Sequence, residues 1–305
     1  MRVRARVLLA AATTLAALVV APARAADPTV LVSSRYDGSL VRVTLVGRVA
    51  TVEELVPGGG DIFHAPTQAI GTRIAYAIWN ETRTGDRYDV GLADATTGDH
   101  RTVTADGHSG FLLVSPDGRF RYVMKTDREG FLVSLVRTDA AGRYPRTLVN
   151  KPRYSVAELS GAGLTGDGST IYLAQTPATG TSTLFGVDTV SGATRPVRPN
   201  APLGRVHNVV VSPDGRTLAV SYQAADDSVH VALVTVATGA VRELLTYGGQ
   251  TASAFSRDGT AVVLSAPFVP VVLGPEPGLA LADVATGVVT PIAGTGGLLQ
   301  AVPVQ

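Results

Sequence analysis

Five ionisable residues stand where their side chains could share one ligand. Imidazole and carboxylate groups that converge can bind a divalent metal ion or act as general base and acid. All five precede a recurring turn by four to seven positions, at the expected start of a strand; they are His64, Glu158, His207, Asp61 and His108. The five residues do not have the regular spacing of a metal-binding or catalytic motif. We therefore expect them to bind a polar ligand, chiefly through His64, Glu158 and His207. The alternative is that each side chain only caps its own loop.

Motifs of the common catalytic machineries are missing from the sequence. Gly107-His108-Ser109-Gly110 is similar to a serine elbow but lacks the glycine required at position 111. The zinc-protease, phosphate-loop, dinucleotide and EF-hand patterns are also missing. Asp226 and Asp227 offer too few oxygens for calcium and are expected in a solvated turn. We therefore expect no catalytic residue, no metal and no cofactor.

The first 25 residues predict an export signal. Arg2, Arg4 and Arg6 precede an apolar run over 7–20, and Ala23-Arg24-Ala25 has the form of a signal-peptidase site. A run of 14 residues is short of the ~20 needed to span a bilayer. Cleavage is expected after Ala25, which gives a secreted or extracytoplasmic protein with no stable membrane insertion.

Composition narrows the class of partner. The chain after residue 25 has 22 basic and 25 acidic residues and no basic run, so nucleic acid is not expected as a partner. It has no cysteine, which excludes disulfides and a lipid-modified cysteine. The remaining candidates are a protein, a peptide or a glycan, bound by a protein expected to be a monomer.

Two turns alternate along the chain. In the first, of the form Ser-Pro-Asp-Gly, proline presets φ, aspartate bonds its own backbone and glycine tolerates the left-handed conformation. Its positions are Asp117, Gly118, Asp167, Gly168, Asp214, Gly215, Asp258 and Gly259, with a degenerate copy ending at Gly71. These glycines are 47, 50, 47 and 44 residues apart. The second turn, of the form Asp-x-x-Thr-Gly, has six glycines, which indicates six units; they are Gly47, Gly98, Gly142, Gly192, Gly239 and Gly287.

Each unit contains four short strands and no helical period, which predicts an all-β, six-bladed β-propeller. Segments 111–114 and 209–211 are apolar throughout, as expected for inner strands covered on both faces. One propeller domain is expected over 26–305. Its blades are expected at roughly 30–57, 61–105, 108–150, 156–199, 205–247 and 251–294.

The two ends of the chain predict how the ring closes. Segment 298–305 is an inner strand without further strands of its own unit, and segment 30–33 begins a unit that lacks an inner strand. We expect 298–305 to complete blade one, which removes an open sheet edge.

The Ser-Pro-Asp-Gly turn, the apolar strand after it and the Asp-x-x-Thr-Gly turn together resemble the WD40-like (PD40-type) repeat of TolB-like propellers from the bacterial envelope. The resemblance covers essentially all of 26–305 and implies the six-bladed fold. That family includes translocation accessory proteins, peptidase-associated propellers and secreted scaffolds. TolB itself has a further domain in front of its propeller, whereas blade one here begins within a few residues of the expected cleavage site.

Two classes of function are compatible with this sequence. The first is a non-catalytic secreted scaffold that binds a protein, peptide or glycan on one face of the disc. The second is a channel-mouth enzyme, such as a lyase, lactonase or glycosidase, that uses the His/Glu cluster. The apolar, Pro-rich segment 266–278 either contacts a partner or folds over its own blade.

Overall fold

The computed structural model describes residues 29–35, 37–46, 49–59, 62–82, 85–150, 158–177, 180–245, 250–265 and 278–304. The expected signal peptide over 1–25, Asp61, the side chain of Glu158 and residues 266–277 lie outside this description. Within the described ranges, no helix has the length and apolar character needed to cross a membrane.

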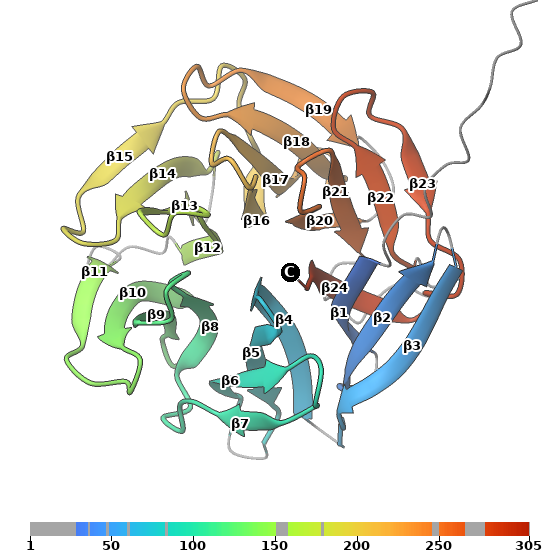
Figure 1. The fold of residues 1–305 in the computed structure, drawn as a ribbon. Helices are drawn as coiled ribbons and strands as arrows, with labels where there is room; N and C mark the ends of the chain where they lie inside the picture. Colours follow the sequence, from blue (N-terminus) through green and yellow to red (C-terminus); the bar gives the residue numbers. More distant parts are fainter. Residues whose placement is uncertain are drawn as a thin grey trace, which may run out of the picture.

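Six four-stranded antiparallel sheets surround one axis, so the predicted six-bladed propeller is confirmed (Figure 1). In every blade the first strand lies nearest the axis and the fourth lies outermost. Blade one contains β24 (Leu298–Pro303), β1 (Thr29–Arg35), β2 (Leu40–Val46) and β3 (Val49–Val56). Blade two contains β4 (Ile62–Ile70), β5 (Arg73–Asn80), β6 (Arg87–Asp94) and β7 (His100–Thr102). Blade three contains β8 (Ser109–Val114), β9 (Phe120–Thr126), β10 (Leu132–Asp139) and β11 (Arg146–Asn150).

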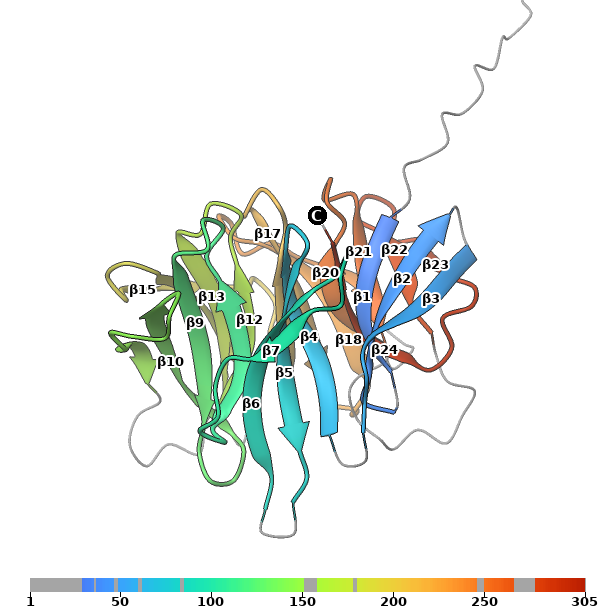
Figure 2. The same cartoon turned by 60° about the horizontal axis from the view of Figure 1, so that its bottom comes forward.

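The second half of the ring follows the same order. Blade four contains β12 (Glu158–Leu164), β13 (Thr170–Thr176), β14 (Thr183–Asp188) and β15 (Thr194–Val197). Blade five contains β16 (Arg205–Val211), β17 (Thr217–Gln223), β18 (Val229–Thr235) and β19 (Val241–Leu245). Blade six contains β20 (Thr251–Phe255), β21 (Ala261–Ser265), β22 (Ala280–Asp283) and β23 (Val289–Pro291). Figure 2 shows the blades standing upright around the axis.

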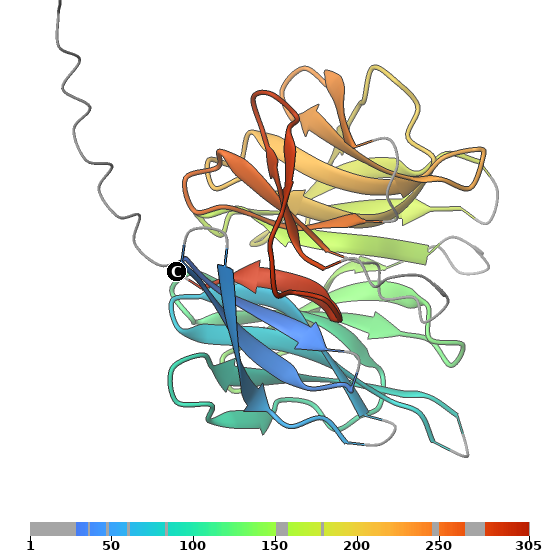
Figure 3. The ribbon, with the colours of Figure 1, turned by 90° about the vertical axis from the view of Figure 1, so that its right-hand side faces the viewer.

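The C-terminal strand closes the ring, as the sequence predicts. β24 pairs antiparallel with β1, with Ala301 opposite Ser33 and Pro303 opposite Leu31. Beyond the strand, the Val304 N–H donates to the Val30 carbonyl at 2.8 Å. The two strands lie side by side in Figures 1 and 3, although they come from opposite ends of the chain.

The first turns are held by a repeated hydrogen-bond network. In blade five the Ser212 hydroxyl donates to Asp214 Oδ1 at 2.6 Å and accepts from the Thr217 N–H at 2.9 Å. Asp214 Oδ1 also accepts from the Arg216 N–H at 3.0 Å. The same bonds recur around Asp117, Asp167 and Asp258. The hydroxyl and amide donors lower the pKa of all four carboxyl groups, because these hydrogen bonds stabilise the ionised form.

Each first turn ends on a glycine with positive φ. The five values are 58° at Gly71, 70° at Gly118, 73° at Gly168, 70° at Gly215 and 74° at Gly259. An L side chain rarely adopts this conformation, so glycine is needed for geometric reasons.

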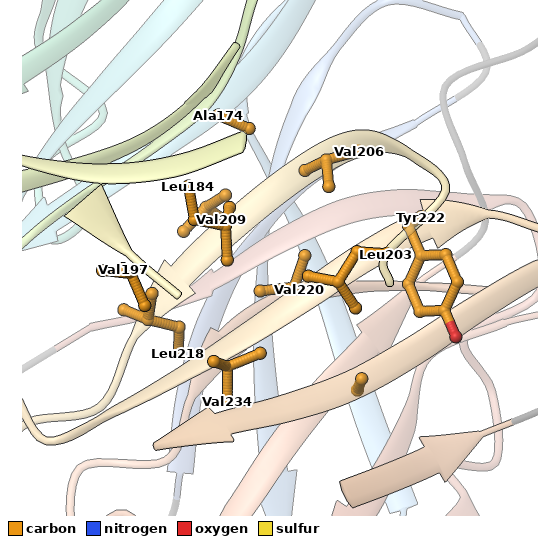
Figure 4. Close-up of a cluster of buried hydrophobic side chains, with 11 residues drawn as sticks. Ala174, Leu184, Val197, Leu203, Val206, Val209, Leu218, Val220, Tyr222 and Val234 are labelled. Atoms are coloured by element: carbon orange, nitrogen blue, oxygen red, sulfur yellow. The ribbon is translucent and has the colours of Figure 1, made fainter. Parts of the chain in front are cut away.

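Each of the six hydrophobic clusters lies between two neighbouring blades. The cluster between blades four and five contains Leu184, Val209 and Leu218 (Figure 4). Five of the interfaces have clusters of nine to eleven buried residues among those described. The cluster between blades two and three has five, namely Ala75, Val90, Leu112, Val114 and Val123. Apolar packing is therefore least extensive between blades two and three.

Replacement of Gly215 by valine should destabilise the propeller. A β-branched residue is strained at φ 70°, and the added Cβ would lie 3.4 Å from Thr165 Cγ2 in the next blade. We expect a loss of about 1 to 3 kcal/mol in the free energy of unfolding, measured by urea denaturation. Gly296→Val is the control, because Gly296 is outside the left-handed range and has open space around its Cβ position. An equal midpoint for the two variants would contradict this account of the turn.

Candidate functional site

A central channel with a volume of about 400 Å³ runs along the axis, lined by residues of all six innermost strands. Its lining is made of apolar and neutral polar residues; among the described lining residues, Arg257 is the only one with an ionisable side chain. Several of the polar groups hold neighbouring blades together. Gln68 Oε1 accepts from the Val114 N–H at 2.7 Å, and Asn208 Nδ2 donates to the Ala252 carbonyl at 2.8 Å.

A β-bulge interrupts the innermost strand pair of every blade. The register shifts at Thr67, Gly110, Gly161, His207 and Ser253, and also between Ser33 and Arg35 where β1 meets β24. A bulge changes the face to which the following side chains point and bends the strand. The bulges therefore decide which residues of each inner strand line the channel.

A second cavity of about 380 Å³, here called the aromatic slot, lies between blades two and three. Its lining consists of Phe63, Ala65, Thr67, Ala77, Trp79, Tyr88, Gly110, Phe111 and Gln300. Thr67, Phe111 and Gln300 also line the channel, so the two cavities adjoin. The slot lies toward the end where the inner strands begin, whereas the first turns, with Pro116 and Pro213, line the opposite end of the channel.

Three aromatic residues form a row across blade two. Phe63 on β4 is opposite Trp79 on β5, and Trp79 is opposite Tyr88 on β6. The Phe63 and Trp79 rings stack, with centroids 5.3 Å apart and planes inclined by 27°. Cross-strand aromatic pairs of this kind stabilise the sheet and keep the rings in place.

The slot exists because small residues occupy the strands behind the row. Ala65 is paired with Ala77, and Gly110 is the bulge residue of blade three. In blade five the equivalent pair, counted from the bulge residue, is Arg205 opposite Gln223, and both have much longer side chains than alanine. The short hydrophobic cluster between blades two and three leaves this space unfilled.

His64 points away from both cavities. Its side chain is 8% exposed, with Nδ1 2.7 Å from the Gly38 carbonyl oxygen and the ring edge-on to Tyr76. Successive side chains of a strand point to opposite faces, so Phe63 and Ala65 line the slot while His64 packs between blades one and two. Burial lowers the pKa of His64, and the neutral ring donates from Nδ1 to Gly38. The expected position of His64 at the channel mouth is therefore not observed.

Of the other predicted residues, the structure describes the side chains of His207 and His108. His207 is the exposed bulge residue of β16, and His108 is exposed at the start of blade three. Glu158 begins β12, opposite Thr176, and Asp61 lies outside the described residues. Within the described part of the chain, no group of three or more His, Cys, Asp or Glu residues could hold a metal ion. Ligand contact by His108, His207, Glu158 and Asp61 stays a prediction.

One constellation has the order of a hydrolase triad. Ser228 Oγ lies 2.8 Å from His230 Nε2, and His230 Nδ1 lies 3.5 Å from Glu243 Oε2. However, the Ser228 hydroxyl donates to Asp226 Oδ1, which also accepts from the Ser228 N–H. The N–H groups of Ala224 and Asp227 are bonded to carbonyls of the same turn, so these amides cannot form an oxyanion hole. The arrangement is a capped turn.

The residues of the aromatic slot were missed in the sequence. The available signal was compositional: aromatic residues make up 6% of the chain, and its only tryptophan, Trp79, lies 16 positions after Phe63 and nine before Tyr88. The strand register that brings the three side chains together is not visible without the pairing of β4, β5 and β6.

The fold and the channel define a six-bladed propeller with an axial cavity, and this fold is similar to that of TolB structures. TolB from Acinetobacter baumannii superposes with a TM-score of 0.68 at 18% identity, covering 91% of this chain and 66% of that chain. A chain of the nidogen/laminin complex superposes with a TM-score of 0.65 at 11% identity, covering 91% of this chain and 98% of that chain. Oligogalacturonate lyase in complex with manganese superposes with a TM-score of 0.52 at 16% identity, covering 87% of this chain and 72% of that chain.

No protein-family model and no curated protein sequence matches the chain. This chain spans slightly less than two thirds of the Acinetobacter TolB chain. At identities of 11 to 18% these likenesses establish the fold alone, and one fold hosts many functions.

His64→Ala should lower stability and change its pH dependence. The variant loses a buried hydrogen bond and leaves a cavity, at a cost of about 1 to 3 kcal/mol. Because burial lowers the pKa of His64, the unfolded chain takes up the proton first. The stability that the neutral, buried His64 contributes is present in full above about pH 6.5, the pKa of histidine in the unfolded chain. It is lost as the pH falls below that value.

Urea denaturation near pH 8 and near pH 5 should therefore show a smaller gap between wild type and His64→Ala at the lower pH. His108→Ala is the control, because the side chain of His108 is exposed, and its midpoint should stay close to that of wild type at both pH values. A gap that does not change with pH would contradict the buried, neutral state of His64.

Proposed function

We propose that this protein is a non-catalytic, extracytoplasmic propeller that binds a protein, peptide or glycan over one face of the disc. The bound partner places a group in the axial channel from the end where the inner strands begin. The observation that carries this proposal is that the channel adjoins the aromatic slot at Thr67, Phe111 and Gln300, and that Arg257 is the one ionisable residue among the described lining residues of the two cavities other than Tyr88.

The chemistry of the lining supports binding over turnover. General acid–base catalysis needs a positioned proton donor or acceptor within hydrogen-bond reach of the substrate. The described channel lining offers apolar, hydroxyl and amide groups, with Arg257 as its one ionisable side chain. Concave, mostly apolar cavities with a few polar groups are typical of ligand-binding sites.

Two further observations support the proposal. The signal-like start of the chain, with an expected cleavage after Ala25, favours export. The propeller of the nidogen/laminin complex and TolB are neighbours of the fold, and the first of these is seen in a complex with another protein. The enzymatic alternative suggested by the lyase neighbour would require reacting groups supplied by residues that stay predictions, such as Glu158 and His207.

Gln300→Arg should weaken ligand binding without unfolding the ring. Gln300 is partly exposed on β24 and lines both cavities, so an arginine there would place a charge and extra bulk at their junction. Binding of the exported protein is measured on a glycan array and on a defined peptide library. We expect at least one probe whose affinity drops tenfold or more in Gln300→Arg.

The matched control is Tyr144→Ala, which removes an aromatic side chain that is 80% exposed and is not part of either cavity. It should leave binding unchanged. Recovery of the bound probe in chemically intact form is expected after overnight incubation. Conversion of the probe to products would overturn the proposal in favour of an enzyme, and no binding on either array would contradict it.

A further inference from the structure

The aromatic slot is a preformed cavity with no charged lining residue among those described. Its members are aromatic, small or neutral polar. A charged group that entered the slot would lose its hydration without gaining an ionic partner, which is costly in a protein interior. An uncharged group pays no such penalty, so the slot selects against charge.

The walls of the slot favour a planar ring. Phe63 and Trp79 are stacked with each other and are followed in the row by Tyr88, while Phe111 lines the slot from blade three. Aromatic rings gain energy from offset-stacked and edge-to-face contacts beyond the burial of their area. Ala65 and Ala77 give depth, because neither has a side chain larger than a methyl group.

The slot is held open by the sheet. The row belongs to the continuous register of β4, β5 and β6, which fixes the rings relative to one another. Tyr88 occupies space left by Gly130, where an added Cβ would lie 2.8 Å from the Tyr88 hydroxyl oxygen. A largely apolar cavity lined by side chains held in this way can bind an aromatic molecule instead of collapsing.

The inner end of the slot has one polar group suited to a ligand. The Thr67 hydroxyl donates to the Leu112 carbonyl at 2.6 Å and is engaged within the fold. Gln300 presents a side-chain amide at the junction with the channel and can both donate and accept hydrogen bonds. A ring in the slot can therefore carry a neutral polar substituent directed toward the axis.

We propose that the aromatic slot is the anchor site for an uncharged aromatic ring, carried either by a side chain of a bound peptide or by a small molecule. This inference rests on the proposed binding function and names the chemical class that its principal subsite takes. Shape, absence of charge and the polar junction at Gln300 all favour the same class of ligand.

The test uses Trp79 as its own reporter, because it is the only tryptophan of the chain and lies in the slot wall. Benzyl alcohol represents the free ring, N-acetyl-Gly-Phe-Gly-amide the peptide-borne ring, and phenylacetate the charged analogue. Emission is excited at a wavelength that these probes do not absorb. We expect a saturable change with both neutral probes and at least tenfold weaker binding of phenylacetate.

Ala77→Leu fills the slot and should abolish the response, and Ala65→Leu provides a second filled variant if the first fails to fold. Tyr144→Ala, which changes an exposed residue outside the slot lining, should respond as wild type does. Tenfold tighter binding of the peptide than of benzyl alcohol identifies a peptide source, and equal binding identifies a small molecule. No saturable response with either neutral probe, or equal binding of phenylacetate, would overturn the inference.

The two proposals fail in different ways. If an array ligand binds and is weakened by Gln300→Arg while the aromatic probes leave Trp79 emission unchanged, the slot inference is wrong and the binding function stands. If the probes bind to the wild type but not to Ala77→Leu, and no array ligand is found, the slot inference holds and the proposed function is wrong.

Discussion

Closure of the ring is the constraint on which this structure depends. Each blade buries its apolar faces only against two neighbours, so an open ring would expose two faces and two sheet edges. The pairing of β24 with β1 removes both, because the first and last strands of the chain share one sheet. Leu298 and Ala301 of β24 then enter the core with blade six, and Val302 enters the core with blade two.

The candidate site arises where this packing is least complete. Between blades two and three the buried cluster is small, and the alanines and glycine behind the aromatic row leave a cavity instead of a filled core. An unfilled cavity costs stability in proportion to its size. The larger cores at the other five interfaces offset this cost, so the ring can include one interface that is packed less completely.

The histidines illustrate why polar residues alone are poor guides to a site on a propeller. The position of His64 along the inner strand suggested a place near a mouth of the channel. Strand alternation instead directs its ring into the interface with blade one, where the Gly38 carbonyl accepts a hydrogen bond from Nδ1. Its neighbours Phe63 and Ala65 took the cavity instead. On this fold, the face to which a residue points therefore decides whether it lines a cavity, whatever its chemical type.

The sequence by itself determined the number of blades, the turns and the closure of the ring. Each turn is set by its own residues, as Asp214 and Gly215 show. Counting these turns along the chain then gives the number of blades and the way in which the ring closes. Only the tertiary structure decided the site. The row of Phe63, Trp79 and Tyr88 needs three strands in register, and the bulge at Thr67 resets which side chains of β4 face the axis. A single extra residue reverses that orientation, and no spacing in one chain reveals it.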